Sequence, residues 1–263
     1  MKIAIFGCGA MGSAFARFFG KSHSLIVFDR NRDKAERLAK ETGGRFCEKV
    51  VDVVKEAEVI LLAVKPKDLG SAAQAMAGAM TKEKVIISVL GGVSLEDLRK
   101  QFPSAKLVRT MPNLALTCGK GVIGLVDDSE MSRETRALIE GLLDGVGLSV
   151  WLTEKKLDAL ASLAGSGIGF VFLLIEAMAE GGVYMGLSAQ ESRELVLQTF
   201  EGAVGLVRQT GKHPAELKAQ VSSPGGTTIE GLRVMEQRGL RGILMDTLIA
   251  CYQKGLTVSK CGK

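Results

Sequence analysis

The first half of the chain alternates short apolar segments with segments of helical periodicity. The apolar segments have four to six residues and show runs of apolar residues rather than alternation, which is typical of strands buried on both faces of a parallel sheet. The strands that this pattern predicts are residues 3–6, 25–28, 59–64, 85–89 and 107–110, with helices between them at 10–19, 32–40, 67–80 and 94–101. Because parallel strands need crossover connections, the alternation predicts a doubly wound α/β domain.

Two more apolar segments, 122–126 and 148–152, are predicted to complete the sheet around a helix at 130–143. After Trp151 the strand signals cease, and glycines or prolines separate helical patterns. The predicted helices are residues 157–163, 168–184, 189–209, 213–220, 229–237 and 240–258. We therefore expect two domains, an α/β domain over residues 1–152 and an all-α domain over residues 153–263.

The helix predicted over residues 168–184 is apolar nearly all round. Such a helix is expected to be buried at the centre of its domain, and in a domain of roughly 100 residues it often packs against a partner chain. This pattern predicts a homo-oligomer. The most apolar stretch, residues 168–175, is too short to span a bilayer, so we expect no membrane partner.

A glycine-rich turn follows the first predicted strand and opens a helix, the setting in which a GxGxxG pattern indicates a dinucleotide site. Gly7 permits the tight turn, Gly9 lets the backbone approach a pyrophosphate, and Gly12 lets helix and sheet pack closely. The first turn of a helix also has unpaired N–H groups that attract anions. The alternative is a glycine-rich turn with no ligand. The predicted cofactor-binding turn is Gly7-Cys8-Gly9-Ala10-Met11-Gly12.

The residues alone leave open whether NADH or NADPH binds. Asp29 ends the second strand, where an acidic side chain usually binds the ribose hydroxyls of NAD. Arg30 and Arg32 follow it, and a guanidinium there suits the 2′-phosphate of NADP. Alternatively, these charges only cap the next helix. The loop that ends a later strand at the same edge of the sheet is expected to line the cofactor crevice, and it is Ala63-Val64-Lys65-Pro66.

A second glycine-rich segment opens a helix near the C-terminus. Its glycines let a ligand approach the backbone, and its serines and threonines add hydroxyl donors. Two anion-binding helix starts, far apart in the sequence, predict an enzyme that brings two small ligands together. The alternative for this segment is an ordinary helix cap. The segment is Ser222-Ser223-Pro224-Gly225-Gly226-Thr227-Thr228.

Charge and cysteine content exclude several classes of partner. The net charge of +5 (34 basic against 29 acidic residues) comes from scattered lysines and arginines without interleaved aromatics, so no nucleic-acid partner is expected. The five cysteines form no CxxC pair and no ligand cluster. This predicts a reducing, cytoplasmic location and no metal site.

Taken together, these motifs resemble the pyrroline-5-carboxylate reductases, and the resemblance covers nearly the whole chain. The serine–glycine–threonine segment followed by Ile229-Glu230-Gly231-Leu232 is highly specific to that family, whereas GxGxxG is shared with many dehydrogenases. The other matching segments are Ala63-Val64-Lys65-Pro66, Arg109-Thr110-Met111-Pro112-Asn113, Gly165-Ser166-Gly167 and His213-Pro214.

The resemblance implies a Rossmann-type dinucleotide domain followed by a helical domain that dimerises by interlocking, with rings of dimers in some members. It implies NADPH, or less often NADH, as the reductant. The implied substrate is a cyclic imino acid, 1-pyrroline-5-carboxylate, which is held between subunits and reduced to L-proline. Met111, Pro112 and Asn113 would then lie at the cofactor, with Ser166 and Val221 at the substrate.

For this substrate, the glycine-rich segment suits a carboxylate. The N–H groups of Gly225, Gly226 and Thr227 would bind it, and the Ser223 hydroxyl would assist. Thr228 would offer its hydroxyl to the imine nitrogen and is the predicted catalytic residue. A protonated imine is already a strong electrophile, so positioning and electrostatics can supply most of the catalysis.

Two departures from the family pattern bear on substrate choice. Asn113 is followed by Leu114-Ala115 where members usually have Thr-Pro, and Gly167 by Ile168-Gly169-Phe170 where they have Pro-Ala-Tyr. An imine reductase for a six-membered cyclic imino acid therefore stays open, as does a non-enzymatic nucleotide sensor. A β-hydroxyacid dehydrogenase is disfavoured, because such enzymes use a lysine early in the second domain and residues 157–193 contain none.

Overall fold

The computed structural model describes residues 1–261, with residues 258–261 described by their backbone alone. The chain divides into two compact units, Met1–Gly165 with the chain from Cys251 onward, and Ser166–Ala250. The division falls after Gly165 because the helix that starts at Glu154 buries Leu157 in the core of the first unit. The predicted boundary between a cofactor domain and a substrate domain, after residue 152, stays a prediction.

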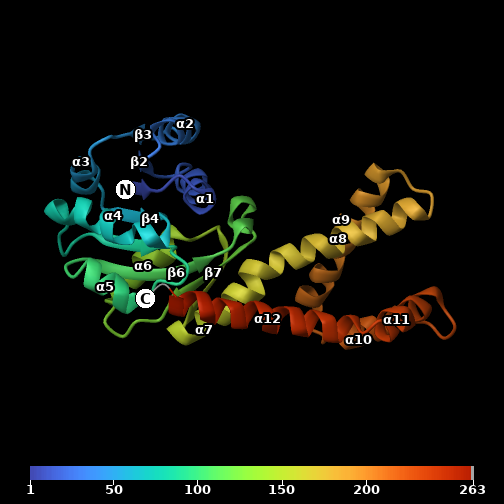
Figure 1. The fold of residues 1–263 in the computed structure, drawn as a ribbon. Helices are drawn as coiled ribbons and strands as arrows, with labels where there is room; N and C mark the ends of the chain where they lie inside the picture. Colours follow the sequence, from blue (N-terminus) through green and yellow to red (C-terminus); the bar gives the residue numbers. More distant parts are fainter. Residues whose placement is uncertain (262–263) are drawn as a thin grey trace. The chain divides into compact units, whose positions relative to one another are not determined.

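The first unit is built on an eight-stranded sheet in the order β3-β2-β1-β4-β5-β6-β7-β8 (Figure 1). Neighbouring strands are parallel except β6 and β7, which are antiparallel. The strands are β1 Lys2–Phe6, β2 Ser24–Phe28, β3 Arg45–Phe46, β4 Val59–Leu62, β5 Val85–Ser88, β6 Lys106–Pro112, β7 Gly121–Val126 and β8 Gly147–Leu152.

Helices cover both faces of this sheet, because successive residues of each strand point to opposite faces and both sets are apolar. In β1, Ile3 and Ile5 enter one buried cluster, and Ala4 and Phe6 enter the other. The first cluster also contains residues of α1 Ala10–Phe19, α2 Arg32–Thr42 and α6 Arg133–Leu142. The second contains residues of α3 Val50–Glu56, α4 Leu69–Met76, α5 Leu95–Gln101 and α7 Glu154–Leu160. The predicted doubly wound α/β fold is confirmed.

Shorter helical segments join these elements. Three are 3-10 helices, η1 Pro66–Asp68, η2 Ala77–Ala79 and η3 Leu114–Cys118. A π-helical segment, Ala161–Ser166, links α7 to the next helix without a break. The predicted helix at 67–80 is therefore divided into η1, α4 and η2.

The second unit contains only helices among the residues described. They are α8 Gly167–Tyr184, α9 Ala189–Thr210, α10 Pro214–Gln220, α11 Thr227–Gln237 and the first half of α12 Leu240–Cys261. α8 and α9 form a hairpin held at Gly182, where a Cβ would come within 2.0 Å of the Ser192 hydroxyl. That hydroxyl donates to the carbonyl oxygen of Ala179 at 2.6 Å. The predicted all-α character of this part of the chain is confirmed.

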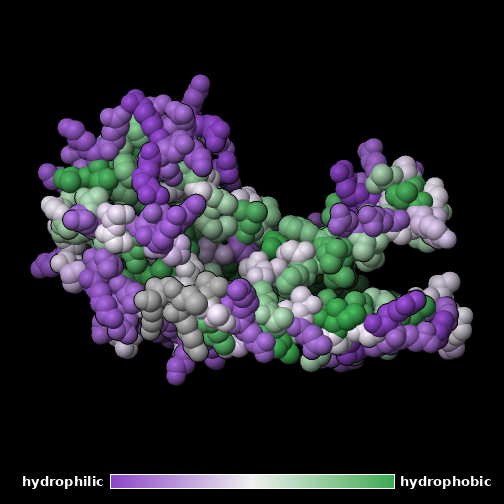
Figure 2. Space-filling view, viewed as in Figure 1, coloured by the Kyte–Doolittle hydropathy of each residue, from purple (hydrophilic) through white to green (hydrophobic). Residues whose placement is uncertain are grey.

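The prediction that residues 168–184 lie buried at the centre of their domain is wrong for the single chain. Phe172 and Leu173 are 58% and 62% exposed, and Figure 2 shows hydrophobic residues gathered along the helices of this unit. Because α7, the π-helical segment and α8 are continuous, Glu154–Tyr184 forms one helix of 31 residues, long and apolar enough to cross a membrane by length and composition. The expectation that the apolar stretch is too short to span a bilayer rested on residues 168–175 alone, whereas the continuous helix has 31 residues.

Candidate functional site

The sheet reverses its strand order at β1. The chain proceeds from β1 to β2 and β3 on one side, and β4 then returns to pair with β1 on the other. In open α/β sheets, a crevice for ligands forms at the carboxyl ends of the strands at such a point. A pocket of about 460 Å³ opens there, and its lining includes Phe6 with Gly7 after β1, and Ala63 with Val64 after β4.

The three glycines of the β1–α1 turn have different surroundings. Gly7 has φ 103°, and a Cβ there would come within 2.4 Å of the Ala63 carbonyl oxygen. A Cβ on Gly12 would come within 1.8 Å of the Gly7 carbonyl oxygen, whereas nothing lies within 4 Å of a Cβ built on Gly9. Gly7 and Gly12 thus permit close backbone packing. Gly9, at the start of α1, leaves open space beside the helix N-terminus, as a pyrophosphate requires.

Asp29 is fixed in place by backbone amides. Its Oδ2 accepts a hydrogen bond from the Cys8 N–H at 2.6 Å, and its Oδ1 accepts one from the Asn31 N–H at 2.8 Å. The carboxylate therefore connects the glycine-rich turn to the start of α2. Because it also lines the pocket, Asp29 stands where a ribose hydroxyl can donate to it.

Basic side chains line the same pocket, namely Arg30, Lys34 and Lys65. The Arg30 guanidinium pairs with the Asp68 carboxylate at 2.6 Å. Arg32, the second arginine predicted for a 2′-phosphate, instead pairs on the surface with Glu36 and Glu48. Arg32 is not among the residues that line the pocket.

Cys8 is a buried thiol between the first two glycines. Burial, reinforced by the negative charge of Asp29, raises the pKa of the Cys8 thiol to about 12. Its Sγ lies 3.9 Å from the Phe28 carbonyl oxygen. Because the thiolate is the nucleophilic form, Cys8 is a neutral packing residue near neutral pH.

The pocket gathers only part of the predicted cofactor set. Gly7, Gly9, Asp29, Arg30, Ala63, Val64 and Lys65 line it, whereas Cys8, Ala10, Met11, Gly12, Pro66, Met111, Pro112 and Asn113 do not. Sequence reasoning missed Asn31, Lys34, Asp68 and Ser71, which also line it. Their only signal was position, since Asn31 and Lys34 come three and six residues after the end of β2, and Asp68 and Ser71 come six and nine residues after the end of β4.

Asn113 has a structural role that the sequence did not predict. The side chain is buried, and its Nδ2 donates to the Ala164 carbonyl oxygen at 3.0 Å. Its Oδ1 accepts from the Val122 N–H, also at 3.0 Å. The amide thereby ties the end of β6 to β7 and to the π-helical segment.

The second predicted site is the start of α11. Gly225 adopts φ 65°, and Gly226 is the N-cap residue, with no side chain accepting from the first turn. The Gly226 N–H donates to the Ser223 carbonyl oxygen at 3.1 Å, which closes the turn. Thr227 and Thr228 are the first two residues of α11 and are exposed. Gly226 thus caps α11 without a side-chain hydrogen bond, and the choice between a ligand site and an ordinary helix cap stays a prediction.

The two serines of this segment differ. The Ser222 hydroxyl donates to the Lys218 carbonyl oxygen of α10 at 2.7 Å. The Ser223 hydroxyl lies against Gly226, because a Cβ built there would come within 2.4 Å of it. Ser223 is thus the serine beside the helix start. Val221 is exposed at the end of α10, and Ser166 is exposed where α8 begins, in separate parts of the chain.

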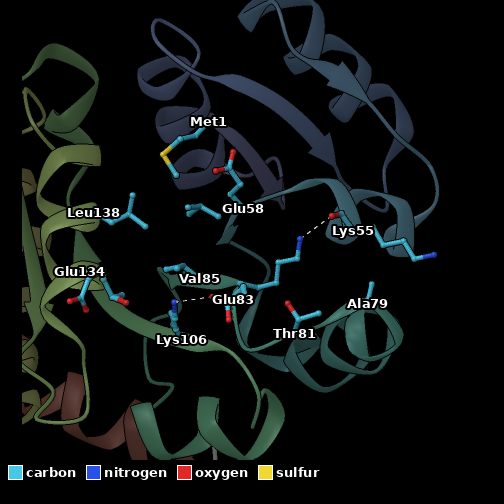
Figure 3. Close-up of a pocket in the computed structure, with 13 residues that line it drawn as sticks. Met1, Lys55, Glu58, Ala79, Thr81, Glu83, Val85, Lys106, Glu134 and Leu138 are labelled. Atoms are coloured by element: carbon cyan, nitrogen blue, oxygen red, sulfur yellow. Dashed lines mark hydrogen bonds and ion pairs between the residues drawn. The ribbon is translucent and has the colours of Figure 1, made fainter.

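Another cavity, of about 600 Å³, lies at the opposite edge of the sheet (Figure 3). Two of its lysines are engaged with protein atoms. The Lys84 ammonium donates to the carbonyl oxygens of Lys55 and Ala57, and Lys106 pairs with Glu83 at 3.5 Å. Since strand amino ends border this cavity, the fold does not favour it as the nucleotide site. Among residues 1–261, no group of His, Cys, Asp and Glu suits a metal ion.

Two family models match separate parts of the chain. Residues 154–257 match the family model described as pyrroline-5-carboxylate reductase dimerisation. Residues 2–92 match the model described as NADP oxidoreductase, coenzyme F420-dependent.

Individual relatives cover almost the whole chain. The pyrroline-5-carboxylate reductase of Aquifex aeolicus is 37% identical over 97% of this chain and 96% of its own. That of Synechocystis is 33% identical over 99% of both. The crystal structure of the Plasmodium falciparum pyrroline carboxylate reductase with NADP bound matches with a TM-score of 0.89 and 26% identity, covering 98% of each chain.

Proposed function

The chain belongs to the pyrroline-5-carboxylate reductase family, and we propose that the turn at Gly225 and Gly226 binds the substrate of its reaction, the reduction of 1-pyrroline-5-carboxylate to L-proline by NAD(P)H. The observation that carries the proposal is the start of α11. There, backbone amides follow a left-handed glycine and no side chain caps them. A carboxylate suits such a helix start, because it pairs with the N–H groups and the positive end of the helix dipole.

The residues around the β1–α1 turn fit a nicotinamide dinucleotide. The open backbone at Gly9 suits the pyrophosphate, and Asp29 and Arg30 suit the adenosine ribose and its substituent. When bound, the reduced coenzyme supplies the hydride that the imine carbon receives. We assign the remaining cofactor contacts to Lys65 and to the backbone of Ala63 and Val64.

The chain's own contribution at the imine is positioning. The Gly226 N–H already donates to the Ser223 carbonyl oxygen, so the amides of Gly225 and Thr227 on either side of it hold the carboxylate, and the Ser223 hydroxyl adds a donor. Thr228, one residue into the helix, presents a hydroxyl that hydrogen-bonds the imine nitrogen and keeps the ring in a single orientation. We retain Val221 and Ser166 as further substrate contacts, and Met111, Pro112 and Asn113 as residues near the cofactor.

The assembly that we propose is a homodimer, alone or as the unit of a ring, in the cytoplasm. Two observations support it. The second unit matches a dimerisation domain, and α8 exposes large apolar side chains that a partner helix would cover. The same apolar surface accounts for the membrane-like composition of Glu154–Tyr184 without a membrane.

The test is a set of parallel assays that follow the absorbance of the reduced nicotinamide. Purified protein with NADPH should lose absorbance at the nicotinamide band when 1-pyrroline-5-carboxylate is added, and a parallel series with NADH measures coenzyme preference. A six-membered cyclic imino acid serves as the competing substrate. Turnover of the six-membered ring alone would replace the proposed substrate, and binding of coenzyme with no turnover of either ring would indicate a nucleotide sensor.

A further inference from the structure

An ion pair stands at the nucleotide pocket of the first unit. The Arg30 Nη2 lies 2.6 Å from the Asp68 Oδ2, and both residues line the pocket. Arg30 follows β2, while Asp68 ends η1, so the pair connects two segments that are far apart in the sequence. The Asp68 side chain is 15% exposed and the Arg30 side chain 72%, which leaves the carboxylate the more enclosed partner.

We propose that Asp68 sets the coenzyme preference by holding Arg30 as an internal counter-ion, an inference that rests on the NAD(P)H-dependent function above. A 2′-phosphate that binds Arg30 must share or displace the Asp68 carboxylate, which also repels it. The 2′-hydroxyl of NADH carries no charge and has no such competition. Asp68 therefore lowers the affinity for NADPH relative to the affinity for NADH.

The other charged residues around the pocket support the same conclusion about Asp68. Asp29 is held by the N–H groups of Cys8 and Asn31, so its carboxylate cannot turn away from an incoming phosphate without losing both hydrogen bonds. The charged residues lining the pocket are three basic (Arg30, Lys34, Lys65) and two acidic (Asp29, Asp68), a balance of +1. Neutralising Asp68 raises that balance to +2 and releases the arginine.

Two nucleotide fragments that differ only in the 2′-phosphate test the proposal by calorimetry on the full-length protein: adenosine 2′,5′-bisphosphate and adenosine 5′-monophosphate. Asp68→Asn keeps the shape of the side chain and removes its charge. Since a partly exposed ion pair is worth up to about fivefold in a binding constant, the variant should bind the bisphosphate up to about fivefold more tightly. Binding of the monophosphate should change by less than about twofold.

Glu48→Gln is the matched control. It changes the net charge by the same one unit and removes one of the two surface partners of Arg32, outside the pocket lining. It should leave the affinities for both fragments unchanged. Equal tightening of the bisphosphate by the two variants would show a general charge effect and overturn the proposal.

A double variant shows whether Asp68 acts through Arg30. In the Arg30→Ala background, Asp68→Asn should lose most of its gain, because no guanidinium remains to be released. An undiminished gain there, no gain in the single variant, or equal gains for both fragments would each overturn the proposal. These titrations contain no imine. A protein that fails to reduce either ring contradicts the proposed function while leaving this result intact.

Discussion

Cys8 is the residue whose surroundings most change its ionisation. Its thiol pKa rises from 9.0 to about 12 because the folded protein buries it beside Asp29. Below pH 9 the thiol is protonated in both the folded and the unfolded chain, so its contribution to stability is fully present. Between pH 9 and about 12 the unfolded chain ionises first, and that contribution is lost as the pH rises.

The expected result is a stability difference that depends on pH. Under reducing conditions, the free energy of unfolding of the wild type should fall relative to that of Cys8→Ala between pH 9 and 11. Urea titrations at several pH values measure it. Cys118→Ala, which removes an exposed cysteine, is the control and should follow the wild type. A constant difference between wild type and Cys8→Ala would contradict the perturbed pKa.

Thr228 is the residue whose removal should affect turnover most directly. Thr228→Ala should lower kcat roughly 10- to 1000-fold, as the loss of one transition-state hydrogen bond does. Thr228→Ser keeps the hydroxyl and should retain most of the activity. Because Thr228 is exposed at the start of α11, the melting temperatures of both variants should match the wild type. Full activity of Thr228→Ala would remove the residue from the mechanism.

Among the elements, the glycine-rich segment at the β1–α1 turn contains one glycine that we assign to ligand binding, Gly9, and another that serves packing, Gly12. Gly9→Ala meets no atom within 4 Å, but its methyl group projects into the open space beside the helix start. It should leave the melting temperature unchanged and abolish detectable NADPH binding. Gly12→Ala would put a methyl group 1.8 Å from the Gly7 carbonyl oxygen and should lower the melting temperature. Thermal unfolding and coenzyme fluorescence measure the two effects, and a stable Gly12→Ala variant would contradict this division.

The central strands could be predicted because each is buried on both faces. All four residues of β4 are buried, so the apolar run is unbroken. β3 has only two residues, and α3 follows Lys49, which provides no capping side chain to mark the helix start, so neither was predicted. The antiparallel pairing of β6 with β7 also escaped prediction, because an apolar run carries no information about strand direction.

Helix ends were predicted where local chemistry decides them. Ser94 accepts from the Asp97 N–H at 3.0 Å, as its position before α5 indicated. At α10, predicted to begin at residue 213, the His213 Nδ1 accepts from the Ala215 N–H and caps the helix. The Arg30–Asp68 pair escaped prediction, since it joins residues 38 positions apart that only the tertiary fold brings together.

For the whole molecule, the exposed surface of α8 is the main departure from expectation. The sequence pattern indicates burial, but one chain alone does not supply enough partner surface to cover the helix. Large apolar side chains exposed together along a helix are typical of protein interfaces. Burial of these residues is therefore a property that we expect of the assembly.

Leu173→Glu tests this expectation. A carboxylate in an apolar interface loses its hydration without gaining a partner. The variant should therefore have the mass of a single chain, whereas the wild type should have the mass of a dimer or a larger oligomer. Light scattering after gel filtration measures both masses. Leu148→Glu replaces a similarly exposed leucine, 56% accessible, on β8 of the first unit and should keep the wild-type mass. A wild type that is already monomeric would refute the dimer.

The nucleotide pocket draws all its lining residues from between Phe6 and Ala75. The glycine-rich segment before α11 lies more than a hundred residues later. The pocket that we assign to the coenzyme and the segment that we propose for the substrate are therefore far apart in the sequence. We therefore expect that recombination between related reductases could exchange the coenzyme preference while the substrate preference is inherited unchanged.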